Sequence, residues 1–264
     1  MLVLALDTAT EAAGVCLATP DGVQASATLS RPRAHAAFLT PAVRFCCEQA
    51  GVGPTEVDGV AVATGPGLYT GLRVGIAAAQ AFAHARGIPV IGRGTLDLIA
   101  YPYRHVRADR VLVAVLDARR REVFWARYRP TGDGVLALGR AEVGPPDRLA
   151  AELAAETEPV LCVGEGAARH RAVLQAARAH VAAPFGVQPS ATALAELALP
   201  ALARGEGVGP GGLRPLYLRA ADATIGWDAR RGRRGVPGPA GPADPEGATG
   251  ATAPAAGQPG QVEP

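Results

Sequence analysis

The first feature of the chain is a pattern of apolar and polar positions that occurs twice. Leu2–Asp7 is an apolar run that ends in aspartate, and a short polar connection leads from it into the apolar run Gly14–Ala18. Val111–Asp117 leads in the same way into Glu122–Tyr128. Short apolar runs bounded by polar residues are typical of buried strands. The pattern therefore predicts two strands, joined through an aspartate and a tight turn, in each half of the chain.

A third strand is expected in each half, and the repetition suggests two domains. The turn signals Asp21-Gly22 and Thr131-Gly132-Asp133-Gly134 follow the second strands. The two halves are only slightly alike in sequence, so internal duplication is a hypothesis. We expect a first domain of residues 1–107 with 208–228, to which Leu216–Arg219 returns, and a second domain of residues 108–207. Residues 229–264 are rich in glycine, proline and alanine, which predicts a disordered tail.

Between these hairpins the apolar positions recur at helical spacing. Phe38, Leu39, Val43 and Cys46 form such a stripe. The predicted helices are Arg33–Ala50, Gly71–Arg86, Pro146–Ala155, Gly166–His180 and Ser190–Arg204. Further strands are predicted at Gly59–Thr64, Ile88–Ile91 and Pro159–Val163. Alternating strands and helices indicate an α/β fold.

The segment Gly65–Gly75 joins a glycine-rich turn to the start of a helix. Pro66 and its neighbouring glycines permit a tight reversal, and Thr70 is a candidate N-cap. The helix then places small residues on one face at Gly71, Gly75, Ala79 and Ala83. Three interpretations are open, namely a structural turn packed on its own sheet, a helix that faces a partner, and a loop that binds phosphate. If the face meets a partner, Gly75→Leu should fold but lose partner binding.

Composition narrows these alternatives. The chain has no lysine, so its 26 basic residues are all arginine, and a Walker-type phosphate loop and lysine Schiff-base chemistry are excluded. The formal net charge is +2, and the arginines are spread along the chain, so composition gives no footprint for DNA or RNA. Apolar residues make up 48% but aromatic residues only 5%, which suits closely packed α/β layers of alanine and valine.

The cysteines, histidines and serines predict no metal site and no nucleophile. The spacing of the four cysteines, Cys16, Cys46, Cys47 and Cys162, is not that of metal ligands, and we expect buried free thiols. No two histidines are four residues apart, and no serine lies in a GxSxG context. The first residues lack the basic region of a signal peptide and reach Asp7 too soon for a membrane span. A cytoplasmic protein that does not contact membranes is expected.

Four stretches in this order resemble the TsaB family, formerly YeaZ, over about residues 1–228. They are the first strand-aspartate-turn-strand unit, Gly65–Gly75, Leu116–Arg119 with Glu122–Ala126, and Pro215–Arg219. The resemblance implies the two-lobed fold of the actin, Hsp70 and sugar-kinase superfamily (ASKHA) with a degenerate nucleotide site. It implies a non-catalytic subunit needed to form N6-threonylcarbamoyladenosine (t6A) at position 37 of tRNA.

The resemblance also implies partners. The catalytic subunit TsaD would form a heterodimer with this chain, the ATPase TsaE would join at their junction, and a TsaC-type enzyme would supply threonylcarbamoyl-AMP. tRNA would be contacted only through the complex, and the isolated protein could form a homodimer. The family's helical interface maps onto the two helices at 33–50 and 71–86, with the candidate residues His35, Phe38, Leu39, Val43, Cys46, Gly71, Leu72, Val74, Gly75, Ala78, Ala79 and Phe82.

An enzyme of the same superfamily is the rival interpretation. Asp7, Thr8 and Thr10 could organise a metal and phosphates, and a second loop at Gly164-Glu165-Gly166 could face an adenosine. Bulk and charge at Asp117-Ala118-Arg119 argue against a second phosphate loop. We therefore expect no catalytic residue, no resident metal and no required cofactor, with ATP or ADP at the complex junction as an open possibility. A weak ATPase or small-molecule kinase is the alternative, and a peptidase is less favoured.

Overall fold

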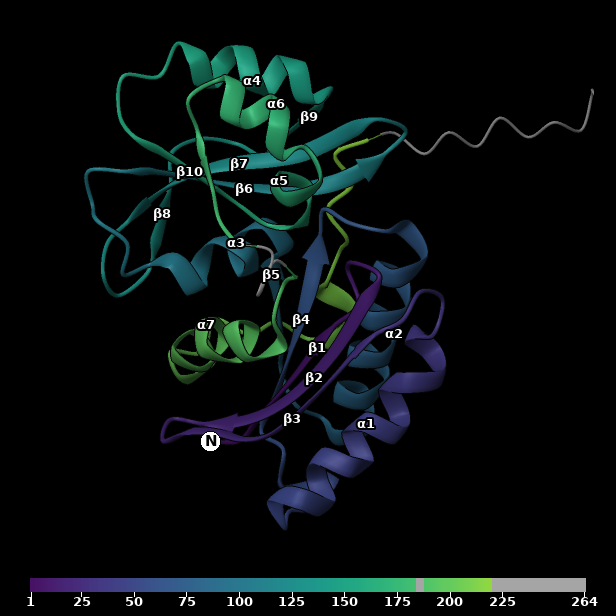
Figure 1. Cartoon of the computed structure of the whole chain (residues 1–264). Helices are drawn as coiled ribbons and strands as arrows, with labels where there is room; N and C mark the ends of the chain where they lie inside the picture. Colours follow the sequence, from purple (N-terminus) through teal and green to yellow (C-terminus); the bar gives the residue numbers. More distant parts are fainter. Residues whose placement is uncertain (184–187, 220–264) are drawn as a thin grey trace, which may run out of the picture. The chain divides into compact units, whose positions relative to one another are not determined.

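Two β-sheets with helices packed on them form the part of the chain that the computed structural model describes, residues 1–183 and 188–219 (Figure 1). The described residues fall within one unit, Met1–Ala220. The tail predicted at 229–264 lies outside the described residues. Within the described part, no helix combines the length and the apolar character that crossing a membrane requires.

The first sheet is built on the hairpins predicted at the N-terminus. Its order is β3-β2-β1-β4-β5, in which β1 pairs antiparallel with β2 and parallel with β4. The antiparallel β2–β3 and parallel β4–β5 pairs complete it. The strands are β1 Val3–Asp7, β2 Ala12–Thr19, β3 Gly22–Ser30, β4 Gly59–Gly65 and β5 Val90–Gly94.

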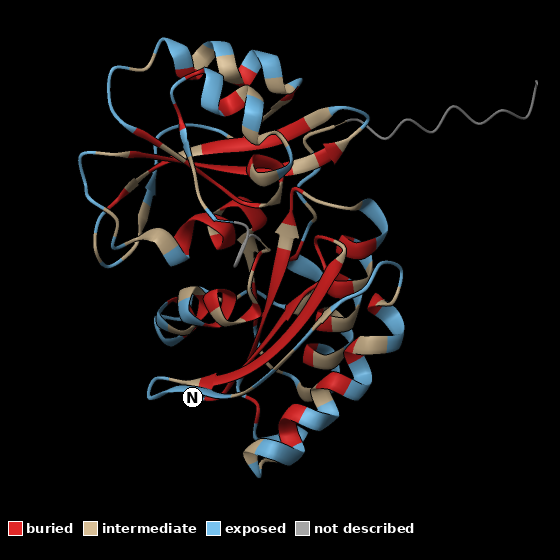
Figure 2. Ribbon diagram, viewed as in Figure 1, coloured by how far each residue is buried: buried red, intermediate tan, exposed pale blue. Residues whose placement is uncertain are grey.

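Alternation of side chains along these strands explains why helices cover both faces of the sheet. Leu4 and Leu6 of β1 pack in one cluster with residues of α1 (His35–Ala50) and α2 (Tyr69–Arg86). Val3 and Ala5, which point the opposite way, pack with residues of α7 (Ala191–Ala203). A strand that is apolar on both faces must be covered on both, and Figure 2 shows these central strands buried.

The second sheet repeats the topology of the first. Its order is β11-β10-β6-β7-β8, with β9 also paired to β7. The strands β6 and β7 form an antiparallel hairpin, as β1 and β2 do in the first sheet. Strand β10 then pairs parallel with β6, and β11 pairs parallel with β10, as β4 and β5 do beside β1. Its strands are β6 Val111–Arg119, β7 Glu122–Pro130, β8 Val135–Ala137, β9 Glu142–Gly144, β10 Val160–Val163 and β11 His180–Val181. The shared order agrees with the repeated pattern in the sequence.

Helix α3 (Thr95–Ala100) packs against both sheets and was not predicted. Its Leu98 lies in the cluster of the first sheet with α7, whereas Leu96, Ile99 and Ala100 lie in a cluster of the second sheet with Leu112. Six residues, of which Thr95 and Asp97 are polar, are too few to show a helical periodicity in the sequence. Tertiary burial on two sides therefore decides its structure.

The helix predicted at Ser190–Arg204 forms, and Ser190 caps it by accepting a hydrogen bond from the Thr192 amide at 3.2 Å. We expected this helix in the second domain, but it packs on the first sheet through residues such as Leu194 and Ala198. The chain therefore re-enters the first sheet before residue 208. The spacing of apolar residues predicts the helix, but it does not indicate which sheet covers the apolar face.

The helix predicted at Gly166–His180 is interrupted. The structure has α5 (Glu165–Arg169) and α6 (Arg171–Ala176), and His180 already belongs to β11. The remaining predicted helix is α4 (Pro146–Ala154), which packs with α6 over the second sheet. Short 3₁₀ turns occur at Pro54–Glu56, Tyr101–Tyr103 and Pro210–Gly212.

The small-residue face of α2 lies against its own sheet. A Cβ on Gly71 would lie 2.1 Å from the Thr8 carbonyl oxygen, and one on Gly75 would lie 2.3 Å from Thr8 Oγ1. Ala79 and Ala83 on the same face are buried as well. The helix begins at Tyr69 after Leu68, without a side-chain cap, so the prediction of Thr70 as N-cap is wrong. Of the three interpretations of this segment, packing on the chain's own sheet therefore describes the small-residue face, and a partner cannot contact that face.

We expect Gly75→Leu to lower the free energy of unfolding by about 3 kcal/mol or more, the upper range for overpacked cores. The Thr8 hydroxyl cannot move away easily because it donates a hydrogen bond to the Gly71 carbonyl oxygen at 2.7 Å. Urea unfolding measures the change. Ala77→Leu is the matched control, since Ala77 lies on the exposed face of the same helix and should tolerate leucine. Equal stability of the two variants would contradict the inward packing.

Candidate functional site

The three residues expected at a nucleotide are buried at the carboxyl end of β1. Asp7, Thr8 and Thr10 are each at most 2% exposed. Asp7 Oδ1 accepts the Ala9 amide at 3.0 Å, and Thr10 Oγ1 accepts the Ala12 amide at 3.2 Å. Thr8 uses its hydroxyl to hold α2. These polar groups are thus occupied within the fold and stabilise the turn between β1 and β2.

Burial also changes the acidity of Asp7. Desolvation raises the pKa of its carboxyl from 3.8 to about 6, against the lowering effect of hydrogen bonds from the Ala9 and Thr8 backbone. The described residues contain no group of three or more His, Cys, Asp or Glu side chains able to hold a metal ion.

The glycine-rich turn closes over the same end of β1. The Leu68 amide donates to the Ala9 carbonyl oxygen at 2.8 Å, and a Cβ on Gly67 would lie 2.3 Å from that oxygen. Backbone therefore meets backbone where a phosphate loop would leave space. Only glycine, which has no Cβ, allows the backbone at positions 67 and 71 to lie this close to the backbone of Ala9 and Thr8.

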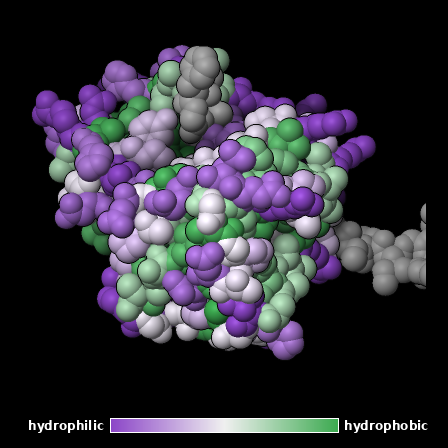
Figure 3. Space-filling view, turned by 90° about the horizontal axis from the view of Figure 1, so that it is seen from below, coloured by the Kyte–Doolittle hydropathy of each residue, from purple (hydrophilic) through white to green (hydrophobic). Residues whose placement is uncertain are grey.

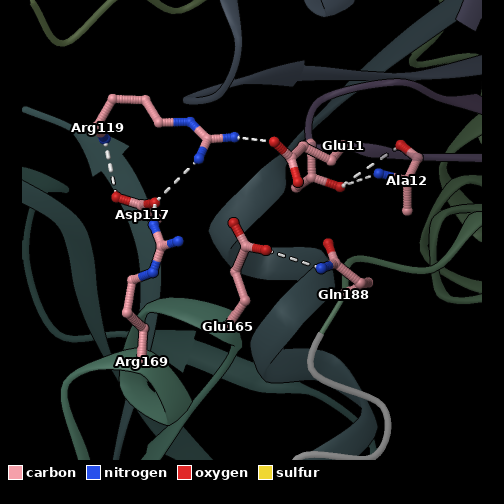
Figure 4. Close-up of polar contacts among 8 residues, drawn as sticks. Glu11, Ala12, Asp117, Arg119, Glu165, Arg169 and Gln188 are labelled. Atoms are coloured by element: carbon pink, nitrogen blue, oxygen red, sulfur yellow. Dashed lines mark hydrogen bonds and ion pairs between the residues drawn. The ribbon is translucent and has the colours of Figure 1, made fainter. Parts of the chain in front are cut away.

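Charged side chains from the second sheet cross to the first at this point (Figure 4). The guanidinium of Arg119, at the end of β6, forms an ion pair with Glu11 in the β1–β2 turn and lies 3.4 Å from Asp117 Oδ2. Arg169 of α5 forms a second ion pair with Asp117, whose side chain is 8% exposed. Because Arg119 and Glu11 are about half exposed, each pair stabilises little alone. Together they occupy the space between the two sheets with protein side chains.

A half-buried glutamate, Glu165, lies beside these ion pairs. Glu165 Oε2 accepts a hydrogen bond from Gln188 Nε2 at 2.7 Å, and the pKa of Glu165 is raised chiefly by its burial. The cavity left among Glu11, Asp117, Arg119, Glu165 and the glycine-rich turn has a volume of about 10 Å³. That is about the space one water needs, so this cavity is too small for a nucleotide.

The second candidate loop is shaped by packing as well. Gly164 has φ +101°, and a Cβ there would lie 2.4 Å from the Val115 carbonyl oxygen. A Cβ on Gly166 would lie 2.8 Å from the carbonyl carbon of Leu116. Both glycines therefore allow α5 to lie against β6, and this contact accounts for them without an adenosine.

The residues predicted at a partner interface divide into two groups. One group is buried in the fold: His35, Leu39, Cys46, Gly71, Leu72, Gly75 and Ala79. Of these, Leu39 still lines the apolar groove between α1 and α2, whereas the others pack inside the fold. The other group is half-buried and reaches the surface: Phe38, Val43, Val74, Ala78 and Phe82. Glycine and alanine at four-residue spacing suit close packing on the chain's own sheet as well as on a partner. The sequence prediction therefore selected the inward face of α2.

An apolar groove lies between α1 and α2 on the side away from the sheet's other helices. Its volume is about 640 Å³. Its walls include Val43, Ala78, Ala81 and Phe82, and its rim carries the exposed Arg44–Glu48 ion pair at 2.7 Å. Hydrophobic patches among hydrophilic side chains also show on the face seen from below in Figure 3. Sequence reasoning missed Ala81 because an exposed alanine does not differ from its neighbours in pattern.

The cysteines behave as predicted. Cys16, Cys46, Cys47 and Cys162 are buried free thiols. Burial raises the pKa of Cys16 and Cys162 to about 12, so these thiols stay protonated and serve as small apolar residues.

Comparison with known proteins places this fold in a family. The family model described as TsaD, tRNA N6-adenosine threonylcarbamoyltransferase, matches residues 23–227. The solved structure of YeaZ from Pseudomonas aeruginosa has a TM-score of 0.70 and 33% sequence identity, and the match covers 82% of this chain and 99% of that chain. The TsaB protein of Escherichia coli is 40% identical over 136 residues. The chain belongs to the TsaB (YeaZ) branch of the TsaD family.

Coverage differs among TsaB relatives. The E. coli match covers 51% of this chain and 58% of the E. coli protein, little more than half of each. An uncharacterized Mycobacterium tuberculosis protein is 40% identical over 223 residues, which cover 84% of this chain and 93% of that protein. The family assignment confirms the sequence prediction of a two-lobed ASKHA-like α/β fold, and the two sheets of shared topology are its lobes.

The raised pKa of Asp7 gives this TsaB-family chain a pH dependence of stability. The folded value, about 6, exceeds the ordinary 3.8, so the folded state binds the proton more tightly. Stability from this group is complete below about pH 4 and falls as pH rises through about 6. We expect Asp7→Asn to gain up to about 3 kcal/mol relative to wild type between about pH 4 and pH 7 in urea unfolding. A difference that does not change with pH would contradict a buried, raised Asp7.

Proposed function

We propose that this chain is the non-catalytic scaffold subunit required for forming t6A on tRNA. Its TsaB relatives in E. coli and Bacillus subtilis are named as tRNA threonylcarbamoyladenosine biosynthesis proteins. The observation that carries the proposal is a contrast within one molecule. The space between the lobes, where a related enzyme would hold its nucleotide, is filled by protein side chains, whereas the outer side of α1 and α2 has an open apolar groove.

The groove is the proposed docking site for the catalytic subunit TsaD. An exposed apolar groove of this size is unfavourable in water and is typical of a surface that another protein covers. Half-buried Val43, Ala78 and Phe82 supply its apolar walls, and the charged rim suits the edge of an interface. Binding would thus use the outward side of the helices, while the glycine face of α2 fixes the helix on the sheet.

The remaining steps of t6A formation belong to partners in this proposal. TsaD would transfer the threonylcarbamoyl group, TsaE would bind at the junction of the two subunits, and a TsaC-type enzyme would supply the activated group. In the absence of TsaD, the same groove could be covered by a second copy of this chain. No side chain of this chain would act on the reacting atoms.

Ala81→Glu should abolish co-purification with the TsaD of the same organism, with at least a tenfold loss of affinity. Ala81 lines the groove and is exposed, so glutamate should not disturb folding but would bring an unpaired charge into the interface. Co-expression and pull-down measure the effect. Leu136→Glu is the matched control, because Leu136 is an exposed apolar residue on β8 of the other sheet. Retained binding by Ala81→Glu would place the interface elsewhere.

The purified chain should not hydrolyse ATP in the presence of Mg²⁺. The Arg119–Glu11 and Arg169–Asp117 ion pairs occupy the space between the lobes, and Asp7 is buried below the turn. Release of phosphate is the readout. Turnover by the chain without TsaD would overturn the scaffold proposal and favour an ATPase or kinase of the same fold.

A further inference from the structure

An exposed cluster of tyrosine and arginine lies where the end of the described chain meets the start of α2. Tyr69 and Tyr217 are 46% and 40% exposed, and their ring centroids are 5.2 Å apart. The guanidinium carbon of Arg73 lies 4.0 Å from the centroid of the Tyr69 ring, and Arg73 Nε donates to Tyr217 Oη at 3.1 Å. Arg73 and Tyr217 are 144 positions apart, so only the tertiary structure brings them together.

The cluster is fixed from both sides. The Leu216 amide donates to the Thr64 carbonyl oxygen at 2.7 Å, which ties the returning segment to the end of β4. Arg219, two residues beyond Tyr217, forms an ion pair with Glu122 at the start of β7. Aromatic rings held at the surface by such contacts lose little conformational freedom when they bind a ligand. They therefore form a preorganised surface.

The ion pair of Arg219 brings a second group of arginines to the same edge. Glu122 directly follows the β6–β7 turn Arg120-Arg121, and these two residues and Arg119 at the end of β6 have φ of 52°, 63° and 63°. Glycine and asparagine are the usual residues at such angles. Non-glycine residues that keep positive φ are typical of functional sites, and here the strained turn presents consecutive arginines.

The charge on this edge is not fully neutralised. Arg73 contacts two tyrosines, and it forms no ion pair with any residue in the described ranges. Arg121 is exposed. By contrast, Arg148 of α4 lies over the Trp125 ring of the second sheet, at 5.2 Å from its centroid, but is paired with Glu142 and Glu152. Uncompensated cations beside open aromatic rings attract phosphates and offer faces on which bases can stack.

We propose that the surface formed by Tyr69, Arg73 and Tyr217 binds single-stranded RNA of the substrate tRNA. The inference rests on the proposed role in tRNA modification and adds to it a direct RNA contact by this chain. RNA is favoured over a protein partner because the cluster is cationic and aromatic, whereas the apolar surface that a protein interface needs lies in the α1–α2 groove. The rings would stack on unpaired bases, and Arg73 would contact phosphate.

The test uses the full chain and a fluorescein-labelled RNA stem-loop with a single-stranded loop, followed by fluorescence anisotropy. Tyr217→Ala and Arg73→Gln should each weaken binding by about tenfold, since loss of one stacked base has an effect of this order. Arg73→Gln should also reduce the slope of log affinity against log salt by about 0.7. Arg148→Gln is the matched control and should bind like wild type. Circular dichroism establishes that each variant is folded.

Several results would overturn the proposal. One is failure of the wild-type chain to bind the RNA probe, and another is wild-type binding of the probe by folded Tyr217→Ala and Arg73→Gln. The surface would instead be a protein contact if these variants lost TsaD in a pull-down and kept RNA binding. Ala81→Glu separates the two proposals, because it should lose TsaD and keep RNA binding. If Ala81→Glu kept both TsaD binding and RNA binding, the docking groove would be contradicted and the RNA surface would not.

Discussion

The close contact between α2 and the β1–β2 turn is the constraint on which the rest of this structure depends. At Gly67, Gly71 and Gly75 the backbone of the helix and its preceding turn meets Ala9 and Thr8 at distances that leave no space for a Cβ. This contact positions α2 on the sheet and closes the end of β1. It also turns the remaining surface of α2 toward α1 and solvent, so the apolar groove and the start of the helix are presented outward.

The two lobes of this TsaB-family chain are joined by polar contacts between the ends of β1 and β6. Arg119 links Glu11 on one side with Asp117 on the other, and Asp117 is shared with Arg169. Individually exposed ion pairs contribute little, but this shared, half-buried group leaves a cavity of only about 10 Å³ between the lobes. The fold therefore keeps its two-sheet architecture while its surface, and not its cleft, carries the proposed function.

The two proposed surfaces use different physics on neighbouring parts of α2. The groove beside Ala81 and Phe82 offers apolar area, whose burial is non-directional and gives affinity for a protein. The cluster at Tyr69 and Arg73 offers charge and open ring faces, which suit a polyanion with exposed bases. One helix can thus serve both contacts because its buried residues, from Gly71 to Ala83, already pack on the chain's own sheet.

The sequence by itself determined the strands, most helices, the family resemblance and the buried thiols, because these follow from local periodicity and from motifs that are contiguous in the chain. It located Gly71 and Gly75 as close-packing positions but could not say which backbone would approach them. Only the tertiary structure decided that this backbone is the chain's own, that α7 covers the first sheet, and that Arg119 meets Glu11. The physical reason is that such contacts join residues far apart in sequence, where no periodicity records the partner.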